Sequence, residues 1–270
     1  MSKLSYVQQN SIIYHFLMKK GAYNMKQNIY DNSTFFEGYK KLRDSGINYN
    51  NFIEQPALKN SLPDLTNKKV LDLGCGMGEF TRYCINKGAL EVVGVDISKN
   101  MIDVARRNNI HDKITFINSS VEDLEISKDY FNVVVSSLAL HYVKDYGAVV
   151  NKINRFLKKG GTFVFSTEHP IVTARKKMNG WVTDENGKKL YFPIDNYQEE
   201  GQREQFWYID GVVKYHRTIS TLINELINNG FQLEKLSEPV AIKEGIEAMP
   251  KIINETRRPS FLIIKSTKIF

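Results

Sequence analysis

From Lys69 onward, short apolar runs alternate with amphipathic stretches, and no other feature constrains the fold as strongly. The runs are four or five residues long, and most are rich in β-branched or aromatic side chains, as strands buried on both faces should be. Such alternation predicts βαβ units and a mostly parallel sheet. The expected strands are residues 70–73, 92–95, 114–117, 131–135 and 162–165, and the expected helices between them are residues 79–88, 99–109 and 145–158.

The end of the third helix and the chain beyond it carry further local signals. Lys158 and Lys159 suit the negative end of a helix and Gly160 suits the cap just beyond it, so we expect the helix to stop there. After Pro170 the alternation stops, and Asn-Gly and Asp-Gly pairs predict tight turns. We expect one hairpin turning at 185–187, a second turning at 210–211 between 206–209 and 212–215, a helix at 218–229, and strands near 231–236 and 260–266.

Composition limits the classes of protein that this chain can belong to. Its 270 residues fit one large domain, or one domain with a cap. The net charge of +7 is spread along the chain, whereas nucleic-acid-binding proteins usually concentrate basic residues on one face. No apolar run approaches the roughly 18 residues of a membrane span, and residues 1–20 lack the pattern of a secretory signal. We therefore expect a cytoplasmic protein with neither a nucleic-acid nor a membrane partner.

The cysteine content allows one further prediction. Cys75 and Cys84 are the only cysteines, and two cysteines suffice for neither a disulfide framework nor a zinc site. We therefore expect no metal centre. The sequence does not indicate an oligomeric state.

A glycine-rich turn follows the first expected strand, in the stretch VLDLGCGMG at residues 70–78. Glycine lets a ligand approach the main chain closely, and ligands of open parallel sheets bind at the carboxyl ends of the strands. The spacing G-x-G-x-G differs from the G-x-G-x-x-G of dinucleotide-binding folds, and Glu79 stands where their third small residue would be. The carboxylate of Asp72 would repel a pyrophosphate, so the turn favours a ligand that carries an ammonium group.

Two more polar positions follow the next strands. Asp96 ends the second strand, 18 residues after Gly78, where a carboxylate can accept two hydrogen bonds from a ribose diol. Ser120 and Val121 follow the third strand, and a small polar residue beside an apolar one suits the edge and face of an adenine. These positions favour a ligand that contains a ribose and an adenine.

The motifs over about residues 68–170 resemble those of the class I S-adenosylmethionine-dependent methyltransferases. The resemblance implies a Rossmann-like, three-layer α/β sandwich with a mostly parallel seven-stranded sheet, an antiparallel last strand and added cap elements. It implies S-adenosylmethionine as the cofactor and a methyl acceptor as the partner. It also implies a set of cofactor-binding residues, namely Tyr39, Asp72, Gly74, Cys75, Gly76, Asp96, Ile97, Met101, Ser120, Val121 and Ser137.

A second resemblance, to one bacterial subgroup of unassigned substrate, lies at residues 166–171, Trp181 and residues 211–217. The reaction implied is in-line transfer of the methyl group to an O, N or C atom of a small-molecule acceptor. Because the cofactor is already activated, the protein mainly orients and desolvates the reactants, and it needs a base only if the acceptor loses its proton early. The candidate catalytic residues are His141, after the fourth strand, and Glu168 and His169, at the end of the fifth.

Three alternatives stay open at this point. An RNA or protein methyltransferase of the same fold would carry a basic concave face beside the crevice. A nicotinamide-dependent oxidoreductase is disfavoured by the glycine spacing and by Asp72. A cofactor-binding regulator without catalysis is the third. For the domain organisation we expect an N-terminal helical cap segment at 1–67 and a methyltransferase domain at 68–270 with an inserted hairpin lid at 171–217.

Overall fold

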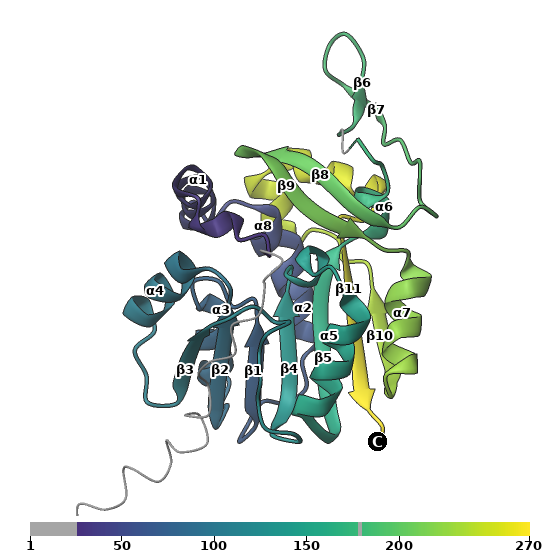
Figure 1. Cartoon of the computed structure of the whole chain (residues 1–270). Helices are drawn as coiled ribbons and strands as arrows, with labels where there is room; N and C mark the ends of the chain where they lie inside the picture. The colour runs from purple at the N-terminus through teal and green to yellow at the C-terminus, as the bar shows by residue number, and fades with distance from the viewer. Residues whose placement is uncertain (1–25, 178–179) are drawn as a thin grey trace, which may run out of the picture.

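The fold is an α/β sandwich built on one seven-stranded sheet in the order β10-β11-β5-β4-β1-β2-β3 (Figure 1). The structure, a computed structural model, describes residues 26–177 and 180–270. Every strand predicted for the sheet is present, and β11 runs antiparallel to both of its neighbours, as predicted for the last strand. The strands are β1 (Lys69–Leu73), β2 (Glu91–Asp96), β3 (Ile114–Asn118), β4 (Phe131–Ser137), β5 (Leu157–Glu168), β10 (Phe231–Ser237) and β11 (Phe261–Lys268).

Side-chain alternation along the central strands builds the two cores of the sandwich. In β1, Leu71 and Leu73 pack on one face with α5 and α7, whereas Val70 packs on the other face with α2 and α3. Both faces are buried, which explains why the central strands are apolar at nearly every position. The covering helices are α2 (Gln55–Ser61), α3 (Glu79–Asn86), α4 (Lys99–Asn108), α5 (Tyr146–Phe156) and α7 (Ile219–Asn228).

The predicted end of the third helix is wrong. Helix α5 stops at Phe156, and Leu157 is already extended and paired with Phe131 of β4. The pairing then jumps to Thr162 opposite Val133, so the residues between form a bulge in β5, with Gly160 at φ 73°. The lysines and glycines that suit a helix end therefore belong to a strand, because pairing with β4 competes with the helix for this segment.

Further elements gather above the carboxyl ends of the parallel strands (Figure 1). Part of the N-terminal helical cap segment predicted for residues 1–67 lies outside the described residues, and α1 and α2 are the α-helices found within the rest. Among the described residues no helix combines the length and apolar character that a membrane crossing requires. The upper elements are η1 (Ile29–Asp31), α1 (Ser33–Asp44), η2 (Asn50–Glu54), η3 (Leu140–Tyr142), α6 (Pro170–Thr173), β6 (Val182–Thr183), β7 (Lys189–Tyr191), β8 (Gly201–Trp207), β9 (Ile209–His216), α8 (Lys243–Ala248) and η4 (Pro250–Arg257).

Of the two predicted hairpins, the first turns where expected and the second does not. The β6–β7 turn includes Gly187 at φ 76°, whereas the β8–β9 turn falls at Tyr208, with Trp207 paired to Ile209. Gly211, at φ 74°, lies inside β9, where the register is irregular. The Asp-Gly pair thus accommodates a bulge instead of a turn. Packing decides the difference, because the Tyr208 ring lies edge-on to Phe35 of α1, with centroids 5.7 Å apart.

Candidate functional site

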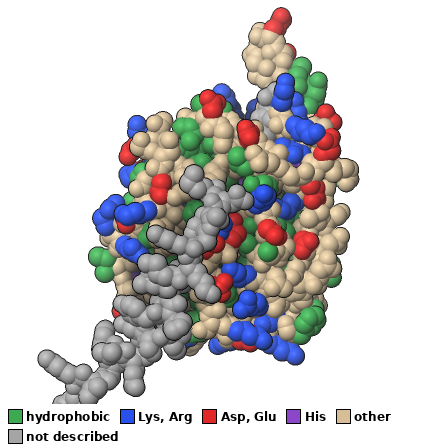
Figure 2. All heavy atoms as spheres, in the orientation of Figure 1, with side chains coloured by type: hydrophobic (Ala, Val, Ile, Leu, Met, Phe, Trp, Pro, Cys, Tyr) green, Lys and Arg blue, Asp and Glu red, His purple; other side chains and the backbone are tan. Residues whose placement is uncertain are grey.

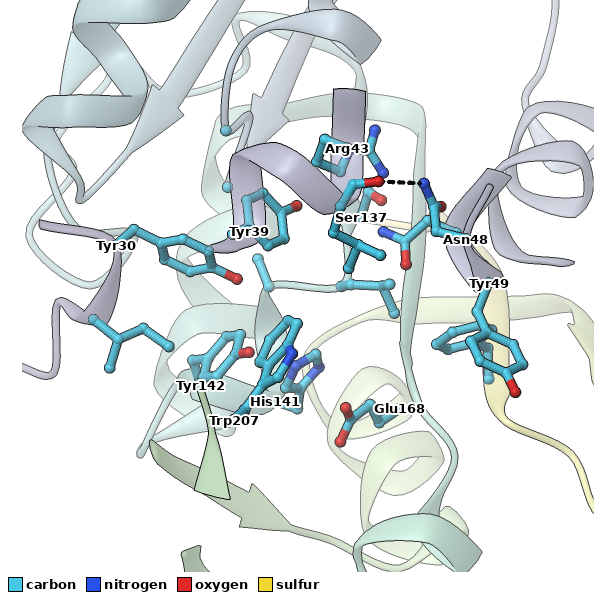
Figure 3. Close-up of a pocket in the computed structure, with 18 of the residues that line it drawn as sticks. Tyr30, Tyr39, Arg43, Asn48, Tyr49, Ser137, His141, Tyr142, Glu168 and Trp207 are labelled. Carbon is cyan, nitrogen blue, oxygen red and sulfur yellow. Dashed lines mark hydrogen bonds between the residues drawn. The ribbon is translucent and has the colours of Figure 1, made fainter. Parts of the chain in front are cut away.

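One cavity of about 850 Å³ lies between the carboxyl ends of the strands and the elements above them (Figure 3). It collects residues from the turns after β1, β2 and β4, from the end of β5, and from α1 and β9. Every residue predicted to bind the cofactor lines it, and so do two of the three catalytic candidates. These residues are Tyr39, Asp72, Gly74, Cys75, Gly76, Asp96, Ile97, Met101, Ser120, Val121, Ser137, His141 and Glu168.

The glycine turn after β1 has the backbone that its sequence predicts. Gly74 and Gly76 have φ values of 75° and 53°, which ordinary side chains rarely adopt. A Cβ atom at Gly74 would lie 2.3 Å from the Cβ of Ala139, whereas one at Gly76 would point into open space. The turn is fixed by the main-chain N–H groups of Gly74 and Cys75, which both donate to the carbonyl of Val95. Gly76 therefore presents bare backbone to the cavity.

Asp72 is a buried carboxylate with one oxygen unused. Its side chain is 1% exposed, and Oδ2 accepts a hydrogen bond of 2.7 Å from the Thr81 hydroxyl. Oδ1 has no partner among the described residues. Burial raises the pKa of Asp72 to about 7. Burying a carboxylate whose second oxygen has no partner costs free energy, and a bound cation would offset that cost. This position therefore fits the positively charged end of an amino-acid ligand.

Asp96 uses both carboxylate oxygens to hold the backbone around it. Oδ2 accepts from the Gly76 N–H at 2.9 Å and Oδ1 accepts from the Ser98 N–H at 2.8 Å. Burial raises the pKa of Asp96 to about 6. Each oxygen retains a lone pair, so the group can still accept hydrogen bonds from a diol. Ser98, in turn, caps α4 by accepting from the Met101 N–H.

The adenine end of the predicted site is crossed by a segment that the sequence reading missed. Lys26 donates to the Ser120 hydroxyl at 2.8 Å and forms an ion pair of 2.6 Å with Asp123. Asp31 accepts from the Ser98 hydroxyl and from the Asn100 N–H. These contacts join residues far apart in the chain, and no local motif signals them. The segment before α1 is thereby fastened across the turn after β3 and the start of α4.

His141 and Glu168 face the same space from the ends of β4 and β5 (Figure 3). Burial lowers the pKa of His141 to about 4, so the ring is neutral at pH 7, and its Nδ1 has no partner among the described residues. Burial alone would raise the pKa of Glu168, but the ammonium of Lys214, an ion-pair partner on β9, together with His141 holds it below its usual range. The second oxygen of Glu168, Oε2, is buried and unpaired in the described structure. The pair thus combines a fixed negative charge with a neutral ring.

His169 lies outside the cavity, contrary to the expectation that it faces the crevice. It is fully buried, its Nε2 hydrogen-bonds Oε1 of Glu238 at 2.9 Å, and its Nδ1 accepts from the Ile171 N–H at the start of α6. Both ring nitrogens are therefore engaged in structure. A position directly after a strand favoured the crevice, but His169 is instead the N-cap of α6, and its bonds to Ile171 and Glu238 fix the ring outside the cavity.

Glu54 is a buried carboxylate within the N-terminal cap segment, and no sequence motif singles it out. It is fully buried in η2 and accepts hydrogen bonds from the hydroxyls of Ser137 and Ser166. Ser137 also accepts a hydrogen bond of 3.1 Å from the Gln55 amide. Burial raises the pKa of Glu54, and the hydrogen bonds oppose that rise. These contacts fix the orientation of Ser137 at the cavity wall.

Aromatic rings from three segments form the upper wall of the cavity. Tyr30 lies edge-on to Tyr39 at 5.0 Å and to Tyr142 at 6.5 Å between ring centroids, and Tyr39 lies edge-on to Trp207 at 6.1 Å. Tyr30, Tyr39 and Trp207 belong to aromatic clusters already visible in the sequence. Their convergence on one wall is a feature of the tertiary structure.

Comparison with known proteins relates this site to a family. A family model described as a methyltransferase domain matches residues 71–165. The crystal structure of a putative S-adenosylmethionine-dependent methyltransferase from Listeria monocytogenes is 40% identical, with a TM-score of 0.73, and covers 80% of this chain and 97% of that one. An S-adenosylmethionine-dependent methyltransferase from Mesorhizobium loti has the same identity and coverage, with a TM-score of 0.75. An uncharacterized protein from Haemophilus influenzae is 34% identical over 91% of this chain and 99% of its own length.

Proposed function

The chain belongs to the S-adenosylmethionine-dependent methyltransferases, and from this premise we propose that its acceptor is a small molecule bound in the cavity. The observation that carries the proposal is a large, mainly apolar cavity beneath two covering elements. A cavity of about 850 Å³ is roofed by α1 and by the β8–β9 hairpin, whose Tyr39, Trp207 and Tyr215 line it. Ligand pockets for small molecules have this size and this apolar lining. A macromolecular acceptor needs an open surface at the reacting centre instead.

The proposed cofactor site is assigned from the charged and polar groups that line the cavity. S-adenosylmethionine supplies a methyl group already activated on a sulfonium. We assign its ammonium to the vacant oxygen of Asp72 and its ribose hydroxyls to Asp96. The bare backbone at Gly76 is where the amino-acid part can approach most closely. The remaining proposed contacts are Tyr39, Gly74, Cys75, Ile97, Met101, Ser120, Val121 and Ser137.

The proposed acceptor site centres on Glu168 and His141. The vacant Oε2 of Glu168 can accept a hydrogen bond from an O–H or N–H of the acceptor and so orient its lone pair toward the methyl group. His141 is neutral at pH 7, so it can take the proton that the acceptor loses, and the Glu168 carboxylate, which favours the protonated ring, would stabilise the imidazolium formed. Lys214 keeps Glu168 ionised and fixed. His169, whose ring nitrogens are both engaged, has no part in this proposal.

The proposed domain organisation assigns covering roles to two segments. Residues 1–67 act as an N-terminal cap, and residues 171–217 act as a lid that excludes water from the reacting centre. In support, Lys214 and Trp207 of the second segment contact Glu168 and the aromatic wall, respectively. A methyltransferase domain at 68–270 then carries the lid as an insertion.

The test is a methyl-transfer screen with labelled cofactor against three separated pools, namely small metabolites, RNA and protein. We expect label in the small-metabolite pool and its loss in Glu168→Gln, with cofactor affinity retained. Glu204→Gln, an exposed change on β8, serves as the matched control. Label that enters only RNA or only protein would reject a small-molecule acceptor, and an unlabelled result in all pools with intact cofactor binding would favour a cofactor-binding regulator.

A further inference from the structure

A group of cations surrounds Trp181 at one end of the cavity. We call Trp181, Lys189, Glu255, Arg257 and Arg258 the Trp181 cluster. The Lys189 ammonium lies 5.0 Å from the Trp181 ring centroid, and the guanidinium carbons of Arg257 and Arg258 lie 4.7 and 5.6 Å from it. All but Arg257 line the same cavity as Asp72 and Glu168. The cluster is therefore part of the cavity wall and not a separate surface feature.

The positive charge of this cluster is only partly neutralised. Glu255 is its one carboxylate; the side chain is 5% exposed, and it lies 3.1 Å from Arg258 and 4.0 Å from Lys189. Burial lowers the pKa of Lys189, and Arg258 and Arg257 lower it further against the opposing effect of Glu255. Three cations thus face one carboxylate within the cluster. An anionic ligand would relieve this imbalance.

Two buried donors of the cluster have no acceptor among the residues that the structure describes. Nε1 of Trp181 and Nε of Arg258 are both inaccessible to solvent and lack a hydrogen-bond partner within the described part of the chain. Both groups are donors only, so only an acceptor can satisfy them. Leaving two buried donors unpaired costs free energy, which is a reason to expect a ligand that supplies the acceptor. An oxyanion supplies acceptor atoms and negative charge together.

The opposite polarity is found where the methyl acceptor is proposed to react. Glu168 Oε2 is a vacant acceptor, and His141 Nδ1 is a vacant ring nitrogen. One cavity therefore presents a hydrogen-bond acceptor at Glu168 and unpaired donors with excess positive charge at Trp181 and Arg258. We propose that the acceptor carries an anionic group, a carboxylate or a phosphate, that binds Arg258 and Trp181 while its O–H or N–H group lies at Glu168. This inference rests on the proposed function, since it names the acceptor class for the same cavity.

A small anion fits these observations better than a nucleic acid. The two vacant donors are buried, and the Arg258 side chain is 15% exposed, so neither can follow a phosphate backbone over the surface. Acidic and basic side chains are also interspersed over the face shown in Figure 2. Binding of an extended polyanion usually requires a continuous basic surface.

The experiment uses the full chain saturated with S-adenosylhomocysteine and three probes that share a phenyl ring: benzoate, its neutral isostere benzamide, and phenyl phosphate. We expect benzoate or phenyl phosphate to bind at one site, at least about tenfold more tightly than benzamide, by calorimetry. Arg258→Met should abolish the preference, and Trp181→Phe, which keeps a ring but removes the N–H donor, should weaken it. Arg107→Met, at an exposed position on α4, should leave it unchanged. The tighter anion identifies the group as carboxylate or phosphate.

Several outcomes would overturn the proposal. They are absence of saturable anion binding, equal binding of benzoate, phenyl phosphate and benzamide, and an anion preference that survives in both Arg258→Met and Trp181→Phe. Binding of an RNA oligonucleotide that competes with the probes and depends on Arg258 would replace the small anion by a nucleic acid. Because the readout is binding and not turnover, it is separable from the labelled-methyl screen. If the labelled-methyl screen fails, the anion-binding experiment can still be interpreted. If anion binding is absent, the screen can still be interpreted.

Discussion

At the scale of single residues, the two aspartates of the cavity differ in what surrounds them. Asp96 is hydrogen-bonded to two backbone N–H groups, whereas Asp72 has one hydroxyl partner and one vacant oxygen. Burial raises both pKa values, and Asp72 reaches the higher of the two, about 7. The residue with fewer partners is thus the one that gains most from a bound cation.

Cofactor binding should therefore depend on pH through Asp72. The free protein holds Asp72 about half protonated near pH 7, and a bound ammonium favours the ionised form, so binding near that pH should release a proton. Below pH 7 the affinity should fall by up to about tenfold per pH unit, and at alkaline pH it should fall again as the α-ammonium of the ligand loses its proton. Calorimetry in two buffers of different ionisation enthalpy measures the released proton. Asp72→Asn should bind weakly at every pH and lose the dependence near pH 7, so that only the dependence of Asp96 near pH 6 remains; a pH-independent affinity in the unmodified protein would contradict the assignment.

Asp96→Ala should weaken cofactor binding by about 1.5–3 kcal/mol, because two charge-assisted hydrogen bonds to the ribose are lost. The sheet should remain folded, since Asp96 lies at the end of β2 and faces the cavity. Titration calorimetry gives the dissociation constant and circular dichroism reports the fold. Asp103→Ala, at a half-buried position on α4 that is not among the cavity-lining residues of the described structure, is the matched control. An unchanged dissociation constant in Asp96→Ala would mean that another residue holds the ribose.

At the scale of elements, α1 and the β8–β9 hairpin are held together by an aromatic core of their own. Phe35 is fully buried and lies edge-on to Trp207 and Tyr208, with centroids 5.2 and 5.7 Å away. Val212 and Ile29 belong to the same core. Because this core lies above the cavity, its packing determines where α1 and the β8–β9 hairpin lie relative to the strand ends.

Phe35→Ala should lower the free energy of unfolding by about 3–5 kcal/mol, the usual cost of removing a buried phenyl ring. The loss of stability should be largest in α1 and the β8–β9 hairpin. The hydrophobic cluster that contains Phe35 includes no described residue of the central strands. Denaturant titration measures the total, and hydrogen exchange locates it. Phe206→Ala removes the same ring from a position that is 72% exposed, so its effect should stay within about 0.5 kcal/mol. Equal effects of the two changes would show that the aromatic core is not closely packed in solution.

At the scale of the whole molecule, the cavity exists only because three separate parts of the chain meet. The strand ends supply Asp72 and Asp96, the N-terminal segment supplies Tyr39, and the hairpin supplies Trp207 and Tyr215. The proposed division of labour gives cofactor binding mainly to the first part, whereas the acceptor site combines Glu168 and His141 of the strand ends with the hairpin. Removing one part while keeping the others tests that division.

Replacing residues 175–215 by a short Gly/Ser linker should leave a folded domain that still binds S-adenosylmethionine. Apart from Tyr39, the proposed cofactor residues lie between 72 and 137, outside the deleted segment. Acceptor turnover should be lost, because Glu168 loses Lys214 and the roof loses Trp207. Calorimetry and the labelled-methyl assay measure the two activities. A folded variant without cofactor binding would place the segment in the cofactor site, and a dimer that becomes an active monomer would make the segment an interface.

The sequence by itself determined the sheet and the positions at its carboxyl ends. Strands buried on both faces must be apolar nearly throughout, so the runs at 70–73 and 92–95 could be assigned without knowledge of their partners. Glycines and aspartates directly after such strands are likewise local signals, because a parallel sheet brings strand ends to one edge. The resemblance to S-adenosylmethionine-dependent methyltransferases, carried by these same residues, is confirmed by the relatives of 40% identity.

Only the tertiary structure decided features that depend on contacts between distant residues. Strand pairing with Phe131 overrides the helix end at Lys158, packing of Tyr208 on Phe35 moves the hairpin turn, and partners on other segments bury His169. Lys26 and Ser120, which are in contact, lie 94 residues apart in the sequence. Arg258, one of the cations around Trp181, likewise lies far from Trp181 in the sequence. Local patterns report what a segment favours alone, whereas the energy of each of these arrangements comes from a partner that the pattern does not contain.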